Sequence, residues 1–198
     1  MDINPLDYTV SELNKLKLKK GRLLIAEPFM DDPNFKRSVV LLTEYNKENC
    51  FGFILNRPLD ITVNDVIVDF PEFKDAAIYM GGPVEIDNLF YMHTQGEYIE
   101  GSQQISENLY WAGNFDQLKK MIINHEIFPH EVRFFLGYSG WDYQQLNNEI
   151  EHDSWIISDA KNMTMEDIDH PELWHNSLKK MGPQYALLSN FPVDPNLN

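Results

Sequence analysis

Three apolar runs of strand length in the first third of the chain constrain its fold more than any other feature. They span residues 23–26, 38–43 and 50–56, and a proline follows the first and the third, at Pro28 and Pro58. Runs rich in branched and aromatic residues that end at such breakers are typical of β-strands. Apolar side chains occupy both odd and even positions, so neither face of these strands suits contact with water. We therefore expect central strands of a sheet that is covered on both faces.

The rest of the chain alternates further strands with a few helices. A strand at residues 132–136 is expected to end in a turn at residues 137–140, where glycines can supply positive φ angles. No repeat and no glycine- and serine-rich linker divides residues 21–198. We expect one α+β domain in which strands outnumber helices, with an irregular tail from residue 190. The patterns predict further strands at residues 77–80, 89–93, 109–113 and 154–157, and helices at residues 62–67, 116–124, 143–151 and within 166–181.

Residues 1–20 are expected to form an extension with a short basic helix over residues 6–20. Leu6, Val10, Leu13 and Leu16 recur at helical spacing. Several lysines follow, and positive charge is favourable near a helix C-terminus. So short a helix is expected to pack on the domain, although a basic amphipathic helix can also contact a membrane surface or an acidic partner.

The negative charge of the chain is concentrated in one part of it. The 16 Lys and Arg residues against 31 Asp and Glu residues give a net charge of −15. Residues 1–50 are neutral, whereas residues 142–172 hold nine acids and one base, Lys161. Phosphate backbones repel such charge, which disfavours a general nucleic-acid binder. The acidic stretch has two interpretations, a solvated face or a docking surface for a basic partner or a cation.

Cysteine content and the N-terminus favour a cytoplasmic protein. Cys50 is the single cysteine, so the fold cannot depend on an internal disulfide. We expect it to be a small buried hydrophobic residue and not a reactive thiol. The first residues lack the basic and apolar regions of a signal peptide, and no run approaches the roughly 20 apolar residues of a membrane span.

Two near-matches to catalytic and metal motifs fail on inspection. Residues 137–141 read Gly-Tyr-Ser-Gly-Trp, but the nucleophile elbow requires a small residue where Trp141 stands. His125 and His130 are one residue too far apart for a zinc-binding helix, and Pro129 would break that helix. The sequence therefore predicts no catalytic residue, no metal ligand and no cofactor.

A polar groove is the alternative to a purely structural role for several turn residues. An arginine at a strand end can bind an anion or a carboxylate, and Gln145 and Glu149 share one face of a helix. The same residues can equally form turns and structural ion pairs that tie the helix to the sheet. The residues that would line such a groove are Asn56, Arg57, Gly81, Gly82, Trp141, Gln145 and Glu149.

Four spaced blocks, taken in order, resemble the YqgE/AlgH family of bacterial proteins. The resemblance runs from about Gly21 to about Gly182. The blocks are residues 23–28 with Asp32, Phe35 and residues 37–40, then residues 52–58, then residues 81–84, and finally residues 135–141 with residues 145–146, residues 149–150 and Trp155. The positions that carry the resemblance and are candidate binding residues are Arg37, Asn56, Arg57, Gly81, Gly82, Pro83, Gly137, Gly140, Trp141, Gln145 and Glu149.

The resemblance implies a fold and leaves the activity open. It implies a single α/β domain whose bifurcated, largely antiparallel sheet folds into a pseudo-barrel with flanking helices. Family members are described as uncharacterised, or as proposed transcriptional regulators after a proposed role in alginate control. The chain departs from the family at Ser139, where alanine is usual, and at Tyr45, where histidine is usual. The departure at Ser139 is a further argument against a nucleophile at that position.

Two functions of different classes therefore stay open. The first is a non-enzymatic, cytoplasmic regulatory or adaptor protein that acts through an unidentified protein partner. The second is a small-ligand-binding protein or enzyme that uses a groove around Arg57, Gly81, Gly82 and Trp141. Direct binding of DNA is the weakest alternative, since the sequence shows no helix-turn-helix pattern and no basic stripe beyond residues 15–22. The oligomeric state is not predicted.

Overall fold

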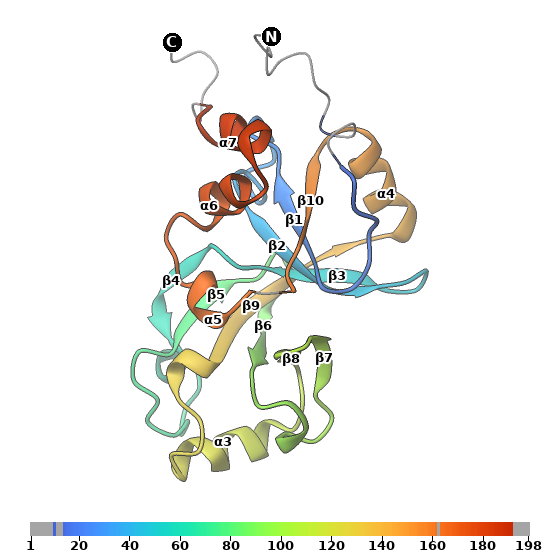
Figure 1. Ribbon diagram of the computed structural model, residues 1–198. Coiled ribbons are helices and arrows are strands. Elements are labelled where there is room, and N and C mark those ends of the chain that lie inside the picture. The colour runs from blue at the N-terminus through green and yellow to red at the C-terminus, as the bar shows by residue number, and fades with distance from the viewer. Residues whose placement is uncertain (1–9, 11–13, 162, 192–198) are drawn as a thin grey trace.

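A curled, largely antiparallel sheet forms the centre of the computed structural model, which describes residues 10, 14–161 and 163–191 (Figure 1). The strands are β1 (Arg22–Ala26), β2 (Val39–Tyr45), β3 (Cys50–Ile54), β4 (Pro58–Thr62), β5 (Ala77–Met80), β6 (Val84–His93), β7 (Gln103–Ser106), β8 (Leu109–Trp111), β9 (Val132–Trp141) and β10 (Trp155–Asp159). The helices are α2 (Val63–Val66), α3 (Phe115–Ile123), α4 (Tyr143–Glu151), α5 (Met165–Ile168), α6 (Leu173–Lys180) and α7 (Pro183–Ser189). Within the described residues, no helix is both long and apolar enough to cross a membrane.

The sheet forks at β9. The main path runs β10-β1-β2-β3-β9-β6-β8-β7, and β5 joins β9 in parallel while pairing with β4 on its other side. On one edge of β9, the first half pairs with β5 and the last residues pair with β3. The opposite edge pairs with β6 along most of its length. This arrangement confirms the bifurcated, mixed α+β architecture.

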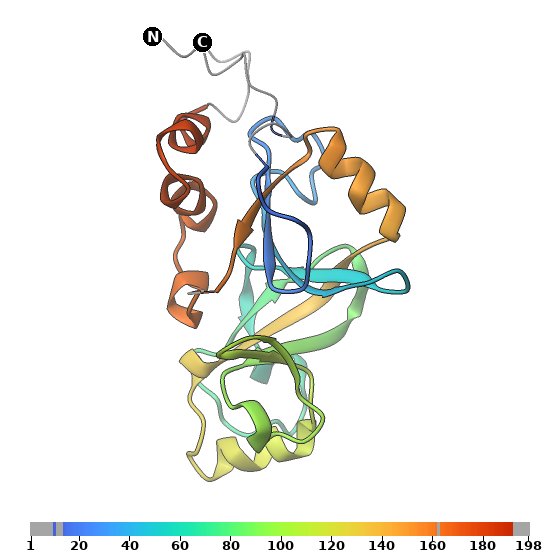
Figure 2. The same ribbon diagram turned by 45° about the vertical axis from the view of Figure 1, so that its right-hand side comes forward.

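The sheet also curls back on itself. A Cβ atom added at Gly21, directly before β1, would lie 2.9 Å from the carbonyl oxygen of Ile105 in β7. Strands β1 and β7 are far apart in the strand order, so this approach requires a strongly curved sheet. Figure 2 shows the resulting half-barrel, with β7 and β8 beneath β3.

Helices cover both faces of the first strands, as their apolar pattern predicts. Leu23 and Ile25 pack in one core cluster with α5 to α7, whereas Leu24 and Ala26 pack in another with Leu146 of α4. In Figure 2, α5 to α7 lie on one side of β1 and β10, and α4 lies on the other. A third cluster fills the space between α3 and the lower half of the sheet.

The expected turn at residues 137–140 is wrong, because β9 continues through it to Trp141. Gly137 does have a positive φ of 66°. Its role is close approach, since a Cβ atom there would lie 2.6 Å from the carbonyl oxygen of Gly82 and 2.7 Å from that of Val84. The pairing of β6 with β9 shifts register between Val84 and Leu89, as expected for a bulge. The glycine therefore bends the strand without ending it.

The expected helix over residues 6–20 is wrong for the part that the structure describes after Val10. No helix covers residues 14–20, where Lys15, Lys17 and Lys19 are exposed and Leu16 and Leu18 are partly buried. This alternation has a period of two, which is typical of an extended segment on a surface. The side chain of Asn14 makes hydrogen bonds to the backbone of β10 of the kind that a neighbouring strand would make. It donates to the carbonyl of Trp155 and accepts from the N–H of Ile157, both at 2.8 Å. Residues 1–9 and 11–13 lie outside the described part.

Candidate functional site

Glycines at the fork of the sheet have a structural role. The carbonyl of Gly81 accepts from the N–H of Ile54 in β3 at 2.8 Å and from the hydroxyl of Ser139 in β9 at 3.0 Å. Its own N–H donates to Leu136. A Cβ atom at Gly82 would lie 2.3 Å from the carbonyl group of Tyr138. These residues join β3, β5 and β9 backbone to backbone.

Ser139 does not have the geometry of a catalytic nucleophile. It lies within β9 and is fully buried, and its hydroxyl donates to the carbonyl of Gly81. A nucleophile elbow requires a sharp turn that exposes the hydroxyl. The motif therefore forms neither a nucleophile elbow nor the expected turn, but a continuous strand.

Arg37, Asn56 and Arg57 bind backbone carbonyls of nearby segments. The amide of Asn56 accepts from the N–H of Val39 at 2.9 Å and donates to the carbonyl of Arg37 at 2.8 Å. Arg57 donates to the carbonyl of Lys36 at 2.8 Å. The guanidinium of Arg37 lies 4.7 Å from the ring centroid of Trp174 in α6 and donates to the carbonyl of Phe191. These contacts fix the loop between β1 and β2 to the strands and to the C-terminal helices.

The carboxylate of Glu149 in α4 has a different environment. It accepts from the indole N–H groups of Trp141 at 2.9 Å and of Trp155 at 2.8 Å, and from the amide of Gln145 at 2.8 Å. All three donors are neutral, so they orient the carboxylate without cancelling its charge. The helix is thereby tied to the ends of β9 and β10. Trp141, Gln145 and Glu149 are thus brought together as the sequence predicts.

A groove of about 780 Å³ opens beside this carboxylate. Five residues that the sequence predicts as candidate binding residues line the groove: Pro83, Gly140, Trp141, Gln145 and Glu149. Arg57 and the other predicted residues are not among its lining residues. The groove is also lined by residues that are not among the predicted candidates: Val10, Glu27, Met30, Asp31, Asp32, Phe35, His152, Asp153, Ser154 and Trp155.

The added residues introduce acidic and aromatic character. Phe35 stacks on Trp141, with ring centroids 5.7 Å apart, and its ring meets that of Trp155 edge to face at 5.4 Å. Burial raises the pKa of Glu27, and the nearby charge of Asp153 raises it further. In the sequence the only pointers were the adjacent Asp31 and Asp32 and the position of Phe35 within the first family block.

A cysteine and a histidine, residue types that often act in catalysis, are buried outside the groove and make local contacts. Cys50 is buried as expected, its thiol contacts the carbonyl of Asn46 at 3.1 Å, and burial raises its pKa. His93 is fully buried beside Ser102, with its Nε2 atom 3.0 Å from the hydroxyl oxygen. The other ring nitrogen accepts from the N–H of Gln95, which leaves the proton on Nε2. A base would need a free lone pair on Nε2, so this pair is not arranged as a nucleophile and its base.

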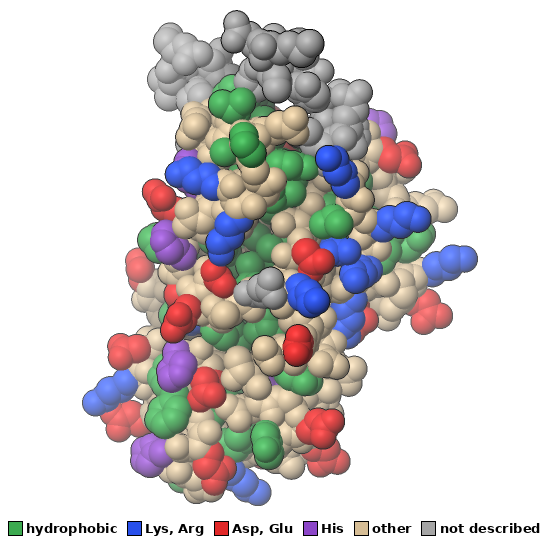
Figure 3. All heavy atoms as spheres, in the orientation of Figure 1, with side chains coloured by type: hydrophobic (Ala, Val, Ile, Leu, Met, Phe, Trp, Pro, Cys, Tyr) green, Lys and Arg blue, Asp and Glu red, His purple; other side chains and the backbone are tan. Residues whose placement is uncertain are grey.

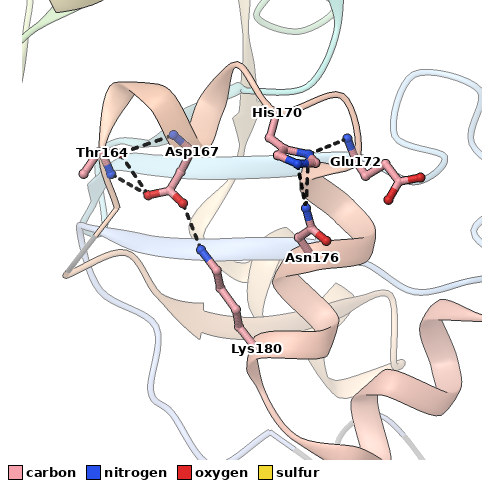
Figure 4. A network of polar contacts seen from close by, with 6 residues as sticks. All are labelled: Thr164, Asp167, His170, Glu172, Asn176 and Lys180. Carbon is pink, nitrogen blue, oxygen red and sulfur yellow. Dashed lines mark hydrogen bonds and ion pairs between the residues drawn. The ribbon is translucent and has the colours of Figure 1, made fainter.

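A second cavity, of about 740 Å³, lies between the segment before β1 and the C-terminal helices. One wall is a polar network (Figure 4) in which Asp167 accepts from Lys180 at 2.9 Å and from Thr164, while His170 contacts Asn176. Its floor is apolar and includes Leu23. Figure 3 shows Lys and Arg side chains gathered on the upper right of this face, above more scattered acids. The cavity therefore combines an apolar floor with charges of both signs.

Comparisons with known proteins give consistent matches along almost the whole chain. A family model described as AlgH-like matches residues 23–186. A UPF0301 protein of Bacteroides fragilis is 41% identical over 198 residues, which is 100% of both chains. A UPF0301 protein of Cytophaga hutchinsonii is 44% identical over 183 residues, 91% of this chain and 100% of the relative.

Two solved structures share the fold. The solution structure of the AlgH protein from Pseudomonas aeruginosa has a TM-score of 0.68 and 26% identity, and the match covers 89% of this chain and 98% of that one. The crystal structure of a protein from Corynebacterium diphtheriae has a TM-score of 0.77 at 23% identity, with 96% and 100% covered. The second likeness supports the fold alone.

Proposed function

The chain belongs to the AlgH-like family, and we propose that it is a non-enzymatic regulatory or adaptor protein that acts in the cytoplasm through contact with another protein. The groove beside Glu149 carries this proposal. It is a concave surface with polar groups fixed in place, and such surfaces are the usual candidates for binding sites. A role in transcription would then be exercised through the partner and not through direct contact with DNA.

The arrangement of the motif residues supports contact over catalysis. Ser139, Asn56 and Arg57 make hydrogen bonds to backbone carbonyls that hold loops and strands together. A catalytic site needs a nucleophile or base within reach of a substrate, together with groups that stabilise developing charge. The groove offers Trp141, Gln145 and Glu149, which suit recognition.

Photo-cross-linking in the native cell tests this proposal. Another hollow, lined by α4, adjoins the groove, and Gln144 is an exposed residue of α4 that lines it. A photoreactive amino acid at position 144 should capture a protein partner. The matched control is the same amino acid at Val68, which is 88% exposed and lies outside both hollows. We expect a discrete adduct from position 144 only. No adduct at 144, or the same adducts from both positions, would contradict the proposal.

A small-ligand receptor or enzyme is the second candidate, and the 740 Å³ cavity beside α5 to α7 favours it. Apolar side chains beside polar groups that can orient a ligand are typical of pockets for small molecules, and this cavity is lined by both. Native mass spectrometry of protein purified from its own cells measures this directly. A stoichiometric small-molecule adduct would support the second candidate, and the bare mass of the chain would count against it.

A further inference from the structure

We infer that the groove beside Glu149 binds a basic segment of the partner protein, with an Arg or Lys side chain placed between its carboxylates and its aromatic residues. The inference rests on the proposed function and names the chemistry of the partner. The groove is built from the loop after β1, the ends of β9 and β10, and α4.

Charge complementarity is the first argument for a basic occupant. Five carboxylates line the groove, and its described lining residues include neither Lys nor Arg. Glu149 accepts hydrogen bonds from three neutral donors, none of which neutralises its negative charge. Burial is the main cause of the raised pKa of Glu27, and repulsion between Glu27 and Asp153 adds to it. A cation placed between them would relieve this repulsion.

The aromatic residues are the second argument. Phe35 is partly exposed, and Trp141 and Trp155 lie directly behind it. A guanidinium or ammonium group is attracted to an aromatic face, and the methylene stem of Arg or Lys packs well on apolar surface. Carboxylates beside aromatic rings therefore match both parts of such a side chain.

The shape of the surface favours a peptide over a small cation. A second hollow of about 960 Å³ runs along α4 and shares Gln145, Glu149, His152 and Ser154 with the groove. The two hollows adjoin at these residues and define a track past Glu149, whose part along α4 is also lined by Asp142 and Lys47. An extended segment can follow this track, with one basic side chain at Glu149 and its neighbours along α4.

Nuclear magnetic resonance with a defined probe tests the inference. The four tryptophans give four indole N–H signals, of which those of Trp141 and Trp155 report on the groove and those of Trp111 and Trp174 report on other regions. The probe is a blocked peptide of sequence Gly-Arg-Lys-Arg-Gly, and the comparison peptide is Gly-Gln-Gln-Gln-Gly. We expect saturable shifts of the two groove signals with the basic peptide only.

Matched variants separate a specific site from general attraction to an acidic protein. Asp31→Asn with Asp32→Asn removes two groove charges, and Asp60→Asn with Asp87→Asn removes two exposed charges elsewhere. We expect the first pair to weaken binding roughly three- to tenfold and the second pair to change it little. Equal weakening by both pairs, no saturable shift, or equally tight binding of spermidine would each overturn the inference.

The two experiments fail independently. If position 144 captures a partner but the basic peptide does not bind, the docking function stands and a basic occupant is wrong. If the peptide binds as expected but no partner is captured in the cell, the chemistry of the groove stands and the docking function is rejected.

Discussion

The fork of the sheet and the groove beside Glu149 lie at opposite ends of the same short stretch, residues 137–141, yet they depend on opposite properties of it. The fork requires the absence of side chains, because Gly82 and Gly137 bring backbone groups within reach of one another. The groove requires particular side chains, because Trp141 and Trp155 orient the carboxylate of Glu149. A motif that reads as one functional unit is thus half backbone geometry and half recognition surface.

Replacing Gly82 should have the largest effect of any change at either region. A Cβ atom in Gly82→Ala would lie 2.3 Å from the carbonyl group of Tyr138 and 2.4 Å from the N–H nitrogen of Ser139, and backbone cannot move aside as a side chain can. We expect a loss of on the order of 4 kcal/mol in the free energy of unfolding, or failure to fold. Urea unfolding followed by circular dichroism measures it.

Gly182→Ala is the matched control for that variant. Gly182 also has a positive φ, 115°, but an added Cβ atom there would have no neighbour within 4 Å. We expect only the cost of the backbone conformation, roughly 1–3 kcal/mol, because φ 115° with ψ 179° is a combination that almost only glycine adopts. Equal losses at positions 82 and 182 would show that the backbone angle matters at the fork and the close approach does not.

Replacing Glu149 should have the next largest effect, and it separates shape from charge. Glu149→Ala leaves two buried indole N–H groups without their acceptor, which should cost roughly 3 kcal/mol. Glu149→Gln keeps an oxygen in place for both indoles, so we expect a loss below about 1 kcal/mol. The free energy of unfolding from urea titration is again the measurement.

The exposed Glu151 on the same helix supplies the control, since Glu151→Ala should change stability by less than about 0.5 kcal/mol. A Glu149→Gln variant as unstable as Glu149→Ala would mean that the negative charge itself holds α4 on the sheet. Glu149 would then serve to hold the helix in place, and the groove, like the fork, would have a structural role.

Elements whose limits are set by local chemistry could be predicted from the sequence. The predicted helix at residues 143–151 is confirmed without a shift at either end. Helix α3 begins one residue before the predicted start, after Asn114, whose side chain accepts from the N–H groups of Asp116 and Gln117 as is typical of asparagine at this position. The strands expected to be covered on both faces are also confirmed. Burial on both faces requires apolar residues at consecutive positions, and that pattern is visible in the sequence.

Features that depend on distant neighbours could not be predicted in the same way. A glycine that bends a strand past Gly82 looks in sequence like one that ends the strand. The alternation of Leu16 and Leu18 was outweighed by an apparent helical spacing earlier in the segment. Asp31 and Asp32 reach the groove only because the loop after β1 folds over the ends of β9 and β10. No local pattern in the sequence records that approach.

The smallest predicted effect tests whether the groove, unlike the fork, responds to protons and to cations. The pKa of Glu27 is raised above 4.5 in the folded state, chiefly by burial and secondarily by Asp153. Folding therefore favours the protonated form, and stability falls as pH rises from the ordinary pKa through the raised one. Glu27→Gln removes this loss, so the variant should exceed the wild type at neutral pH by less than about 0.5 kcal/mol, since solvent reaches the side chain.

The advantage of the variant should disappear below about pH 4, because residue 27 is then largely neutral in the wild type as well as in the variant. Thermal unfolding of the two proteins across this pH range measures it. Adding the basic peptide at neutral pH should shrink the advantage, because a bound cation stabilises the charged carboxylate of the wild type alone. An advantage that stays constant with pH would contradict the raised pKa. If the stability advantage of Glu27→Gln vanishes at low pH but is unchanged by the basic peptide, the occupant of the groove binds away from Glu27.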